Sequence, residues 1–294
     1  MVLVVKKSLE SDFILKVQNL SMTFGGLIAI GSLSFDIMRG KITALIGPNG
    51  AGKTTVFNCI TGFYKPKTGI LLLKDASGKQ YFLEKMSDFS IARNAKVVRT
   101  FQNVRLFPGL TVLENLMVSQ HNYLSRASGY GVFGLLNLDV YKNSTNEAVQ
   151  KAYYWLERIG LVDRANDLAS DLPYGSQRYL EIARAMCAEP NLLCLDEPAA
   201  GLNISESLVL NELLVGICKD MGTSVMLIEH DMSVVMEISD HVIVLEYGVR
   251  IADGSPEEIR NDPKVISAYL GRDDDDDDND DDLKNDHQNV GSLL

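Results

Sequence analysis

A glycine-rich run at residues 47–54, Gly-Pro-Asn-Gly-Ala-Gly-Lys-Thr, matches the P-loop pattern at its four fixed positions. Glycines let successive backbone N–H groups turn toward a phosphate, which side chains at those positions would obstruct. The helix that we expect to begin near Lys53 would point its positive end at the same anion. We expect Lys53 to reach the β- and γ-phosphates and the Thr54 hydroxyl to ligate Mg²⁺. The nucleotide-binding residues expected from this run are Gly47, Pro48, Asn49, Gly50, Ala51, Gly52, Lys53, Thr54 and Thr55.

Two adjacent carboxylates supply the second part of such a site. Residues 192–195 (Leu-Leu-Cys-Leu) have the composition of a buried strand, and Asp196 and Glu197 follow directly. Since ligands of α/β folds bind at the carboxyl edge of the sheet, Asp196 is placed to hold the Mg²⁺ shell. Glu197 is suited to polarising the water that attacks a γ-phosphate. The alternative is that Asp-Glu-Pro only caps the next helix, since acidic residues favour helix starts.

The elements that must position these residues alternate between strand and helix. Apolar runs typical of buried strands occupy residues 41–46, 192–195, 224–229 and 241–246. The helical stretches that separate the later runs indicate an α/β fold with a mostly parallel sheet.

Further local patterns add detail to this fold. We expect a helix to start at residues 56–60, a hairpin at residues 70–83, and a helix over residues 148–159 that Gly160 ends. Residues 104–188 are mostly helical in pattern, with a glycine-rich interruption at Gly129, Gly131 and Gly134. A helical block is therefore predicted to be inserted into the α/β core.

Composition limits the cellular setting. The chain has 294 residues, 46% of them apolar, and no apolar run approaches the roughly 18–20 residues that span a bilayer. The first residues place their lysines after a short apolar stretch, the reverse of a secretory signal. Four scattered cysteines, Cys59, Cys187, Cys194 and Cys218, suit a structural role in a reducing cytosol. Any membrane role must therefore come through a partner.

The charge of the chain is concentrated at its end. The net charge is −11, and residues 271–294 account for −8 of it, with ten Asp against Arg272 and Lys284. A run of this kind repels itself and has little to bury, so residues 273–294 are predicted to form a disordered acidic tail. Solubility is the simplest role for it, and weak cation binding or a regulatory contact are alternatives. An acidic chain without a basic stripe argues against nucleic acid as a partner.

Further motifs resemble those of the ABC ATPases. Residues 172–185 resemble the signature motif, Gln102 matches the Q-loop glutamine, and His230 matches the switch histidine. Residues 200–203 occupy the D-loop position, and Phe24 matches the aromatic residue that stacks on adenine. These motifs, in the family's order, cover nearly everything from about residue 13 to 255.

The resemblance implies a P-loop NTPase (RecA-like) core with an antiparallel β subdomain and an inserted helical subdomain. The implied parts are residues 1–103 (core), 104–188 (helical subdomain with the signature), 189–255 (core), 256–272 (C-terminal helical segment) and 273–294 (tail). It also implies a catalytic unit of two chains, because the signature of one chain completes the P-loop site of the other. A signature helix can offer N–H groups and a positive dipole end to a partner's phosphate.

The roles implied by the family fall into three groups. Catalysis is assigned to Glu197, His230 and Gln102, and Mg²⁺ ligation to Thr54, Gln102 and Asp196. ATP contacts beyond the P-loop are assigned to Phe24, Tyr174, Gly175 and Ser176. Stacking on Phe24, worth roughly 1–3 kcal/mol, reads no hydrogen-bond pattern, which predicts loose discrimination between bases.

Within the ABC ATPases, residues 99–107, 195–203, 228–232 and 254–271 are similar to the larger ATP-binding subunit of bacterial branched-chain amino acid importers. That similarity implies two membrane permeases, a sister ATPase or a second copy of this chain, and a periplasmic binding protein. It also implies a peripheral location on the cytoplasmic face of the inner membrane. Urea importers and lipopolysaccharide exporters share the ending and remain alternatives. A non-transport ABC protein is disfavoured by the single cassette, and a degenerate ATPase by the presence of Lys53, Asp196, Glu197 and His230.

The chain departs from the broad family pattern at three positions. Pro173 stands where the signature usually has Ser, Ser176 where Gln is common, and Asn203 where the D-loop usually has Asp. Without the Ser hydroxyl, one hydrogen bond to a partner's γ-phosphate is lost. The two ATP sites of a heterodimer are therefore predicted to differ in rate.

Overall fold

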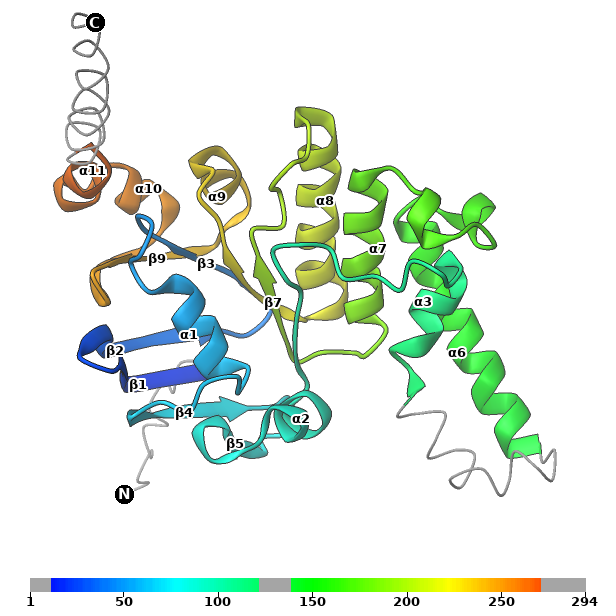
Figure 1. The fold of residues 1–294 in the computed structure, drawn as a ribbon, viewed down its shortest axis with the longest axis horizontal. Coiled ribbons are helices and arrows are strands. Elements are labelled where there is room, and N and C mark those ends of the chain that lie inside the picture. Colours follow the sequence, from blue (N-terminus) through cyan, green and yellow to red (C-terminus); the bar gives the residue numbers. More distant parts are fainter. Residues whose placement is uncertain (1–11, 122–138, 271–294) are drawn as a thin grey trace, which may run out of the picture.

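The computed structural model describes residues 12–121 and 139–270 and contains two sheets flanked by helices (Figure 1). A six-stranded sheet has the order β10-β9-β3-β8-β7-β6, in which every neighbouring pair except β10 and β9 is parallel. A four-stranded antiparallel sheet has the order β2-β1-β4-β5. These strand orders confirm the mostly parallel sheet expected from the sequence.

The strands of the antiparallel sheet are β1 (Phe13–Phe24), β2 (Leu27–Met38), β4 (Thr68–Lys74) and β5 (Gln80–Phe82). The strands of the larger sheet are β3 (Ile42–Ile46), β6 (Val97–Arg99), β7 (Leu192–Asp196), β8 (Ser224–Ile228), β9 (His241–Glu246) and β10 (Val249–Gly254). The α-helices are α1 (Lys53–Ile60), α2 (Asp88–Ser90), α3 (Val112–Val118), α6 (Asp139–Arg158), α7 (Tyr174–Met186), α8 (Ile204–Met221), α9 (Met232–Ile238), α10 (Pro256–Arg260) and α11 (Pro263–Leu270). A π-helical turn (Ile91–Ala95) and short 3-10 turns (Leu83–Lys85, Val162–Arg164, Ala169–Asp171) connect them.

Strand residues of the larger sheet alternate between two hydrophobic cores. On β7, Leu193 and Leu195 pack with helices α6 to α9, whereas Leu192 and Cys194 face the antiparallel sheet and α1. Both faces are covered, so the strands are continuous apolar runs, as expected for a buried parallel sheet. The fully buried Trp155 on α6 belongs to the first of these cores.

Most local expectations are confirmed. Helix α1 begins at Lys53, β4 and β5 pair as a hairpin, and α6 ends at Arg158 with Gly160 in the left-handed region at φ +67°. Such a conformation favours glycine, which explains the helix stop. The interruption at Gly129, Gly131 and Gly134 and the acidic tail lie outside the described residues.

The four cysteines are buried thiols, and burial raises the pKa of Cys59 to about 11 and those of the other three to about 12. This agrees with the structural role expected for them. Within the described residues, no helix is both long enough and apolar enough to cross a membrane.

Candidate active site

Four predicted motifs lie at one edge of the larger sheet. Strands β3, β8, β7 and β6 run parallel as neighbours, so their carboxyl ends meet there. Gly47 follows β3, Asp196 ends β7, and His230 comes two residues after β8. Gln102 comes three residues after β6. The topology therefore gathers residues that are up to 183 positions apart in the sequence.

Glycine is required at both ends of the P-loop. At Gly47, φ is +147°, and a Cβ there would lie 2.1 Å from the carbonyl oxygen of Leu245 on β9. At Gly52, the left-handed N-cap of α1, a Cβ would lie 2.6 Å from the Ile30 side chain. At these two positions the backbone approaches its surroundings too closely for any side chain.

Lys53 is buried and held inside this loop. Its Nζ donates to the carbonyl oxygens of Gly47, at 2.7 Å, and Pro48, at 3.0 Å. The ammonium therefore lies within the cradle that the glycines form. Thr54, the next residue of α1, is exposed at the start of the helix, and Thr55 is half-buried.

The structure brings Glu197, Gln102 and His230 together. The Gln102 amide donates to the Glu197 carboxylate at 2.8 Å, and His230 Nδ1 lies 3.8 Å from Glu197 Oε1. Glu197 has φ +48°, a left-handed conformation that is costly for a residue other than glycine. Its backbone N–H donates to the carbonyl oxygen of Ile228 at 2.9 Å, which holds this conformation between β7 and β8.

Asp196 has a partner that the sequence did not reveal. Arg99 Nη2 lies 3.1 Å from Asp196 Oδ2, and both side chains are only 9% exposed. Arg99 Nη1 also donates to Asn58 Oδ1 on α1 at 2.6 Å. Burial raises the pKa of Asp196, and the Arg99 guanidinium opposes this rise. No spacing rule pairs residues 97 positions apart, so only the tertiary structure could identify Arg99.

A hollow of about 440 Å³ joins the P-loop to the end of the antiparallel sheet. It is lined by residues 49–55 and Glu197, and by Phe24, whose ring meets Tyr64 edge-on with 5.1 Å between centroids. At Gly50 a Cβ would meet no atom within 4 Å, so that position faces open space. Residues 49–55 of the P-loop and the predicted adenine-stacking residue Phe24 therefore share one hollow. Three exposed apolar or aromatic lining residues missed by the sequence reasoning are Leu27, Ile28 and Tyr247.

The predicted signature residues lie elsewhere. Tyr174, Gly175 and Ser176 form the first turn of α7, with Pro173 as the N-cap, and none of them lines this hollow. Gly175 packs against Glu206 of α8, where a Cβ would lie 2.4 Å from the carboxylate. The structure thus separates the signature from the P-loop of its own chain.

Hydrogen bonds hold the last residue of the D-loop and the residue that precedes the loop. Asn203 caps α8 in a capping box with Glu206, accepting the Glu206 N–H at 3.0 Å. On its other side, Glu229 accepts the Ala199 N–H at 2.8 Å, and burial raises the pKa of this carboxyl. Glu229 precedes His230 and is a further residue that the sequence reasoning did not identify.

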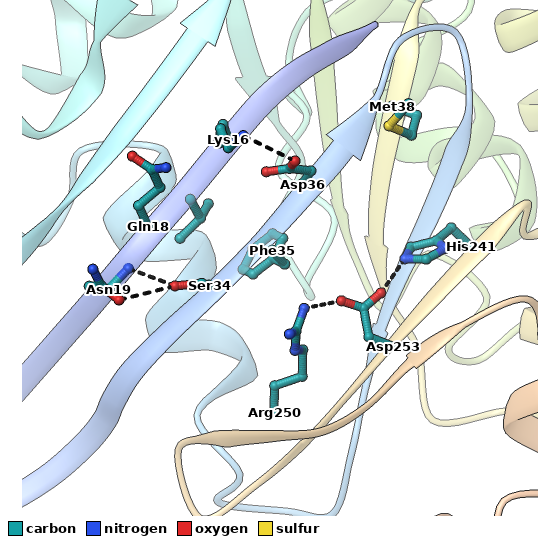
Figure 2. A pocket seen from close by; sticks show the side chains of 11 residues that line it. Lys16, Gln18, Asn19, Ser34, Phe35, Asp36, Met38, His241, Arg250 and Asp253 are labelled. Atoms are coloured by element: carbon teal, nitrogen blue, oxygen red, sulfur yellow. Dashed lines mark hydrogen bonds and ion pairs between the residues drawn. The ribbon is translucent and has the colours of Figure 1, made fainter. Parts of the chain in front are cut away.

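A second hollow, of about 490 Å³, lies between β1, β2 and the β9–β10 hairpin (Figure 2). Its charged lining residues are paired among themselves: Lys16 with Asp36 at 3.6 Å, and Asp253 with both His241 and Arg250. None of the predicted site residues lines it. Because these charges satisfy one another, the hollow at the P-loop is the candidate active site despite its smaller volume.

Residues 30–200 match the family described as "ABC transporter", and residues 249–275 match the family described as "Branched-chain amino acid ATP-binding cassette transporter". The chain is 51% identical over 262 residues to the high-affinity branched-chain amino acid transport ATP-binding protein LivG of Escherichia coli (strain K12), covering 89% of this chain and 99% of that protein. It is 47% identical over 258 residues to the corresponding protein BraF of Pseudomonas aeruginosa, covering 88% and 98%.

Solved structures agree with this relationship. A nucleotide-free ATP-binding cassette from an ABC transporter matches with a TM-score of 0.71 and 29% identity, over 87% of this chain and 98% of that one. The ADP conformation of MJ1267, an ATP-binding cassette of an ABC transporter, matches with a TM-score of 0.72 and 28% identity, over 88% and 99%. The predicted P-loop NTPase fold class is confirmed. The chain therefore belongs to the ABC transporter family and is one of its ATP-binding, ATP-hydrolysing subunits.

Proposed function

We propose that this ATPase energises the import of branched-chain amino acids. The observation that carries the proposal is the 51% identity to the LivG proteins along 89% of the chain. The match of residues 249–275 to a branched-chain amino acid transporter family supports it independently of the ATPase motifs. No equally specific observation favours urea or lipopolysaccharide as the cargo.

At the site, we assign ATP binding to the P-loop and Phe24, with the phosphates beside Lys53. The Lys53 ammonium is bound to two carbonyl oxygens of the loop, and we assign it to the β- and γ-phosphates that the loop would hold. Glu197 would hold the attacking water, with Gln102 and His230 fixing its carboxylate from two sides. Its left-handed backbone is the kind of stored strain that collects at functional sites.

The residues present fit a magnesium ion. Mg²⁺ takes oxygen ligands and usually combines one or two protein carboxylates with phosphate oxygens. Thr54, Asp196 and Gln102 offer a hydroxyl, a carboxylate and an amide oxygen, and we propose them as its ligands. When bound, Mg²⁺ would neutralise charge on the β- and γ-phosphates. No cluster of three or more His, Cys, Asp or Glu residues able to hold a metal occurs within residues 12–121 and 139–270, which suits a metal held mainly by ATP.

We further propose that Tyr174, Gly175 and Ser176 face the ATP of a second ATPase chain. None of the three lines the hollow of its own chain, which supports this proposal. The second chain would be a sister subunit or another copy. Two membrane permeases would hold the pair peripherally at the cytoplasmic face of the inner membrane, and a periplasmic binding protein would deliver the cargo.

The different roles proposed for the P-loop and the signature support the proposed domain boundaries. Residues 1–103 and 189–255 would form the nucleotide-binding core, residues 104–188 the helical subdomain, and residues 256–272 a C-terminal helical segment. Helices α3, α6 and α7 lie within residues 104–188, and α10 and α11 lie within residues 256–272.

The proposal is tested by reconstituting the chain with its permeases and binding protein in proteoliposomes. Leucine is expected to stimulate both uptake and ATP hydrolysis, and Lys53→Ala is expected to abolish both. Stimulation by urea but not by leucine, isoleucine or valine would refute the assigned cargo while leaving the ATPase assignment intact.

A further inference from the structure

Helix α7 carries a fully buried ion pair within the signature motif, one turn beyond Tyr174, Gly175 and Ser176. Arg178 Nη1 lies 3.1 Å from Glu181 Oε2, and their side chains are 0% and 2% exposed. Removing two charges from water is costly unless further hydrogen bonds satisfy them. The groups that hydrogen-bond to Arg178 and Glu181 therefore show which part of the chain the ion pair fixes.

The backbone groups that bind this pair all belong to one short segment, the residues around Gln102. Arg178 donates to the carbonyl oxygens of Phe101, at 2.9 Å, and Gln102, at 2.6 Å. Glu181 accepts the backbone N–H of Arg105 at 2.9 Å. The pair thus binds three backbone groups of residues 101–105, which lie 76 or 77 positions away in the sequence.

The contacts of Arg178 and Gln102 extend to the signature turn on one side and to the proposed catalytic carboxylate on the other. At one end, Arg178 Nη2 lies 3.3 Å from the hydroxyl of Tyr174, a signature residue that is 44% exposed. At the other end, the Gln102 side chain donates to Glu197. A continuous series of contacts therefore runs from the signature turn, through Arg178, to the proposed catalytic carboxylate.

We propose that Arg178 and Glu181 are positioning residues that fix residues 101–105 to the signature helix, so that Gln102 faces Glu197 and follows every movement of α7. The inference rests on the role proposed above for Gln102. It gives one chain a physical connection between the ATP that its signature would face and the ATP that its own P-loop would bind.

The chemistry of the pair dictates the variants. Removing Arg178 alone would leave the buried Glu181 without its ion-pair partner, so the single change threatens folding. The double variant Arg178→Met/Glu181→Leu replaces both charges by apolar side chains, a change that is often neutral for stability. Arg178→Lys keeps the charge but loses the planar fork that reaches two carbonyls, so its effects should be intermediate.

Two measurements test the proposal. Hydrogen exchange across residues 101–105 in the full chain, and above all at the Arg105 amide that Glu181 accepts, reports whether the segment is still held. The kcat and KM for ATP hydrolysis, measured in the complex with permeases, report whether Gln102 still faces Glu197. Arg164→Met is the matched control, because Arg164 and Asp167 form another i,i+3 ion pair, 2.7 Å apart but 37% and 44% exposed. Gln102→Ala separately tests the role of Gln102.

In the double variant, we expect exchange at residues 101–105 to be about tenfold faster, as the loss of charge-assisted hydrogen bonds implies. The kcat should fall about tenfold, with KM within about twofold of the wild type, because placement is lost and nucleotide contacts are kept. Arg164→Met should match the wild type in both measurements.

Wild-type exchange and kcat in the double variant, together with an impaired Gln102→Ala, would overturn the inference. A wild-type kcat in Gln102→Ala would instead refute the proposed role of Gln102, while faster exchange in the double variant would still support the connection. If the double variant does not fold, Arg178→Lys decides: unchanged exchange and kcat there would overturn the inference.

Discussion

Arg99→Met should destabilise the nucleotide-free chain through Asp196. The two side chains are 3.1 Å apart and 9% exposed, so the substitution leaves a buried carboxylate without its counter-charge. Breaking a buried pair from one side typically costs about 3–5 kcal/mol. Since 1 kcal/mol shifts the Tm of a domain of this size by about 2–4 °C, a loss of about 3 kcal/mol lowers it by about 6–12 °C.

Urea unfolding followed by circular dichroism measures this effect. Lys41→Met is the control, because Lys41 and Asp240 form a shorter pair, 2.7 Å, whose side chains are 54% and 38% exposed. Such a surface pair is worth less than about 1 kcal/mol. The double variant Arg99→Met/Asp196→Asn should regain much of the lost stability. Equal costs for Arg99→Met and Lys41→Met, or no recovery in the double variant, would refute the reasoning.

Two further predictions concern the signature and the β9–β10 hairpin. Pro173→Ser should raise ATP hydrolysis at the partner's site by about tenfold, since one hydrogen bond to a charged group is gained. Complexes that also carry Glu197→Gln isolate hydrolysis at the partner's site. An unchanged rate in these complexes would contradict the prediction. Asp253→Asn should cost about 1 kcal/mol at pH 7, because His241, 2.5 Å away, holds the pKa of Asp253 below its usual value. A depressed carboxyl pKa stabilises the fold above the unfolded pKa of about 3.9, and this is lost as pH falls through the folded pKa. The cost measured by urea unfolding should therefore shrink below about pH 4, and a cost independent of pH would count against it.

The sheet edge could be predicted because its signals are local. Each buried strand is an unbroken apolar run, and the residues that follow β3, β7 and β8 carry the chemistry. Once such runs are assigned to a parallel sheet, their carboxyl ends must meet. The sequence alone therefore predicts that Lys53, Asp196 and His230 lie at one site.

The residues that hold the site in place could not be predicted in this way. Arg99 contacts Asp196, which is 97 positions away in the sequence, and Glu229 binds the backbone of Ala199, which is 30 positions away. Arg178 and Glu181 are spaced as helix neighbours, but the sequence does not show that both are buried against residues 101–105. Their positions follow from tertiary packing, which no local pattern encodes.

The most direct test of the account is hydrolysis at the site built from Lys53 and Glu197. In the assembled transporter, with the partner chain's catalytic base already substituted, Glu197→Gln should lower kcat at least about 100-fold. Affinity for a fluorescent ATP analogue should stay within about twofold of the wild type, because the P-loop is unchanged. Turnover near the wild-type rate in Glu197→Gln would contradict the assignment of the catalytic carboxylate.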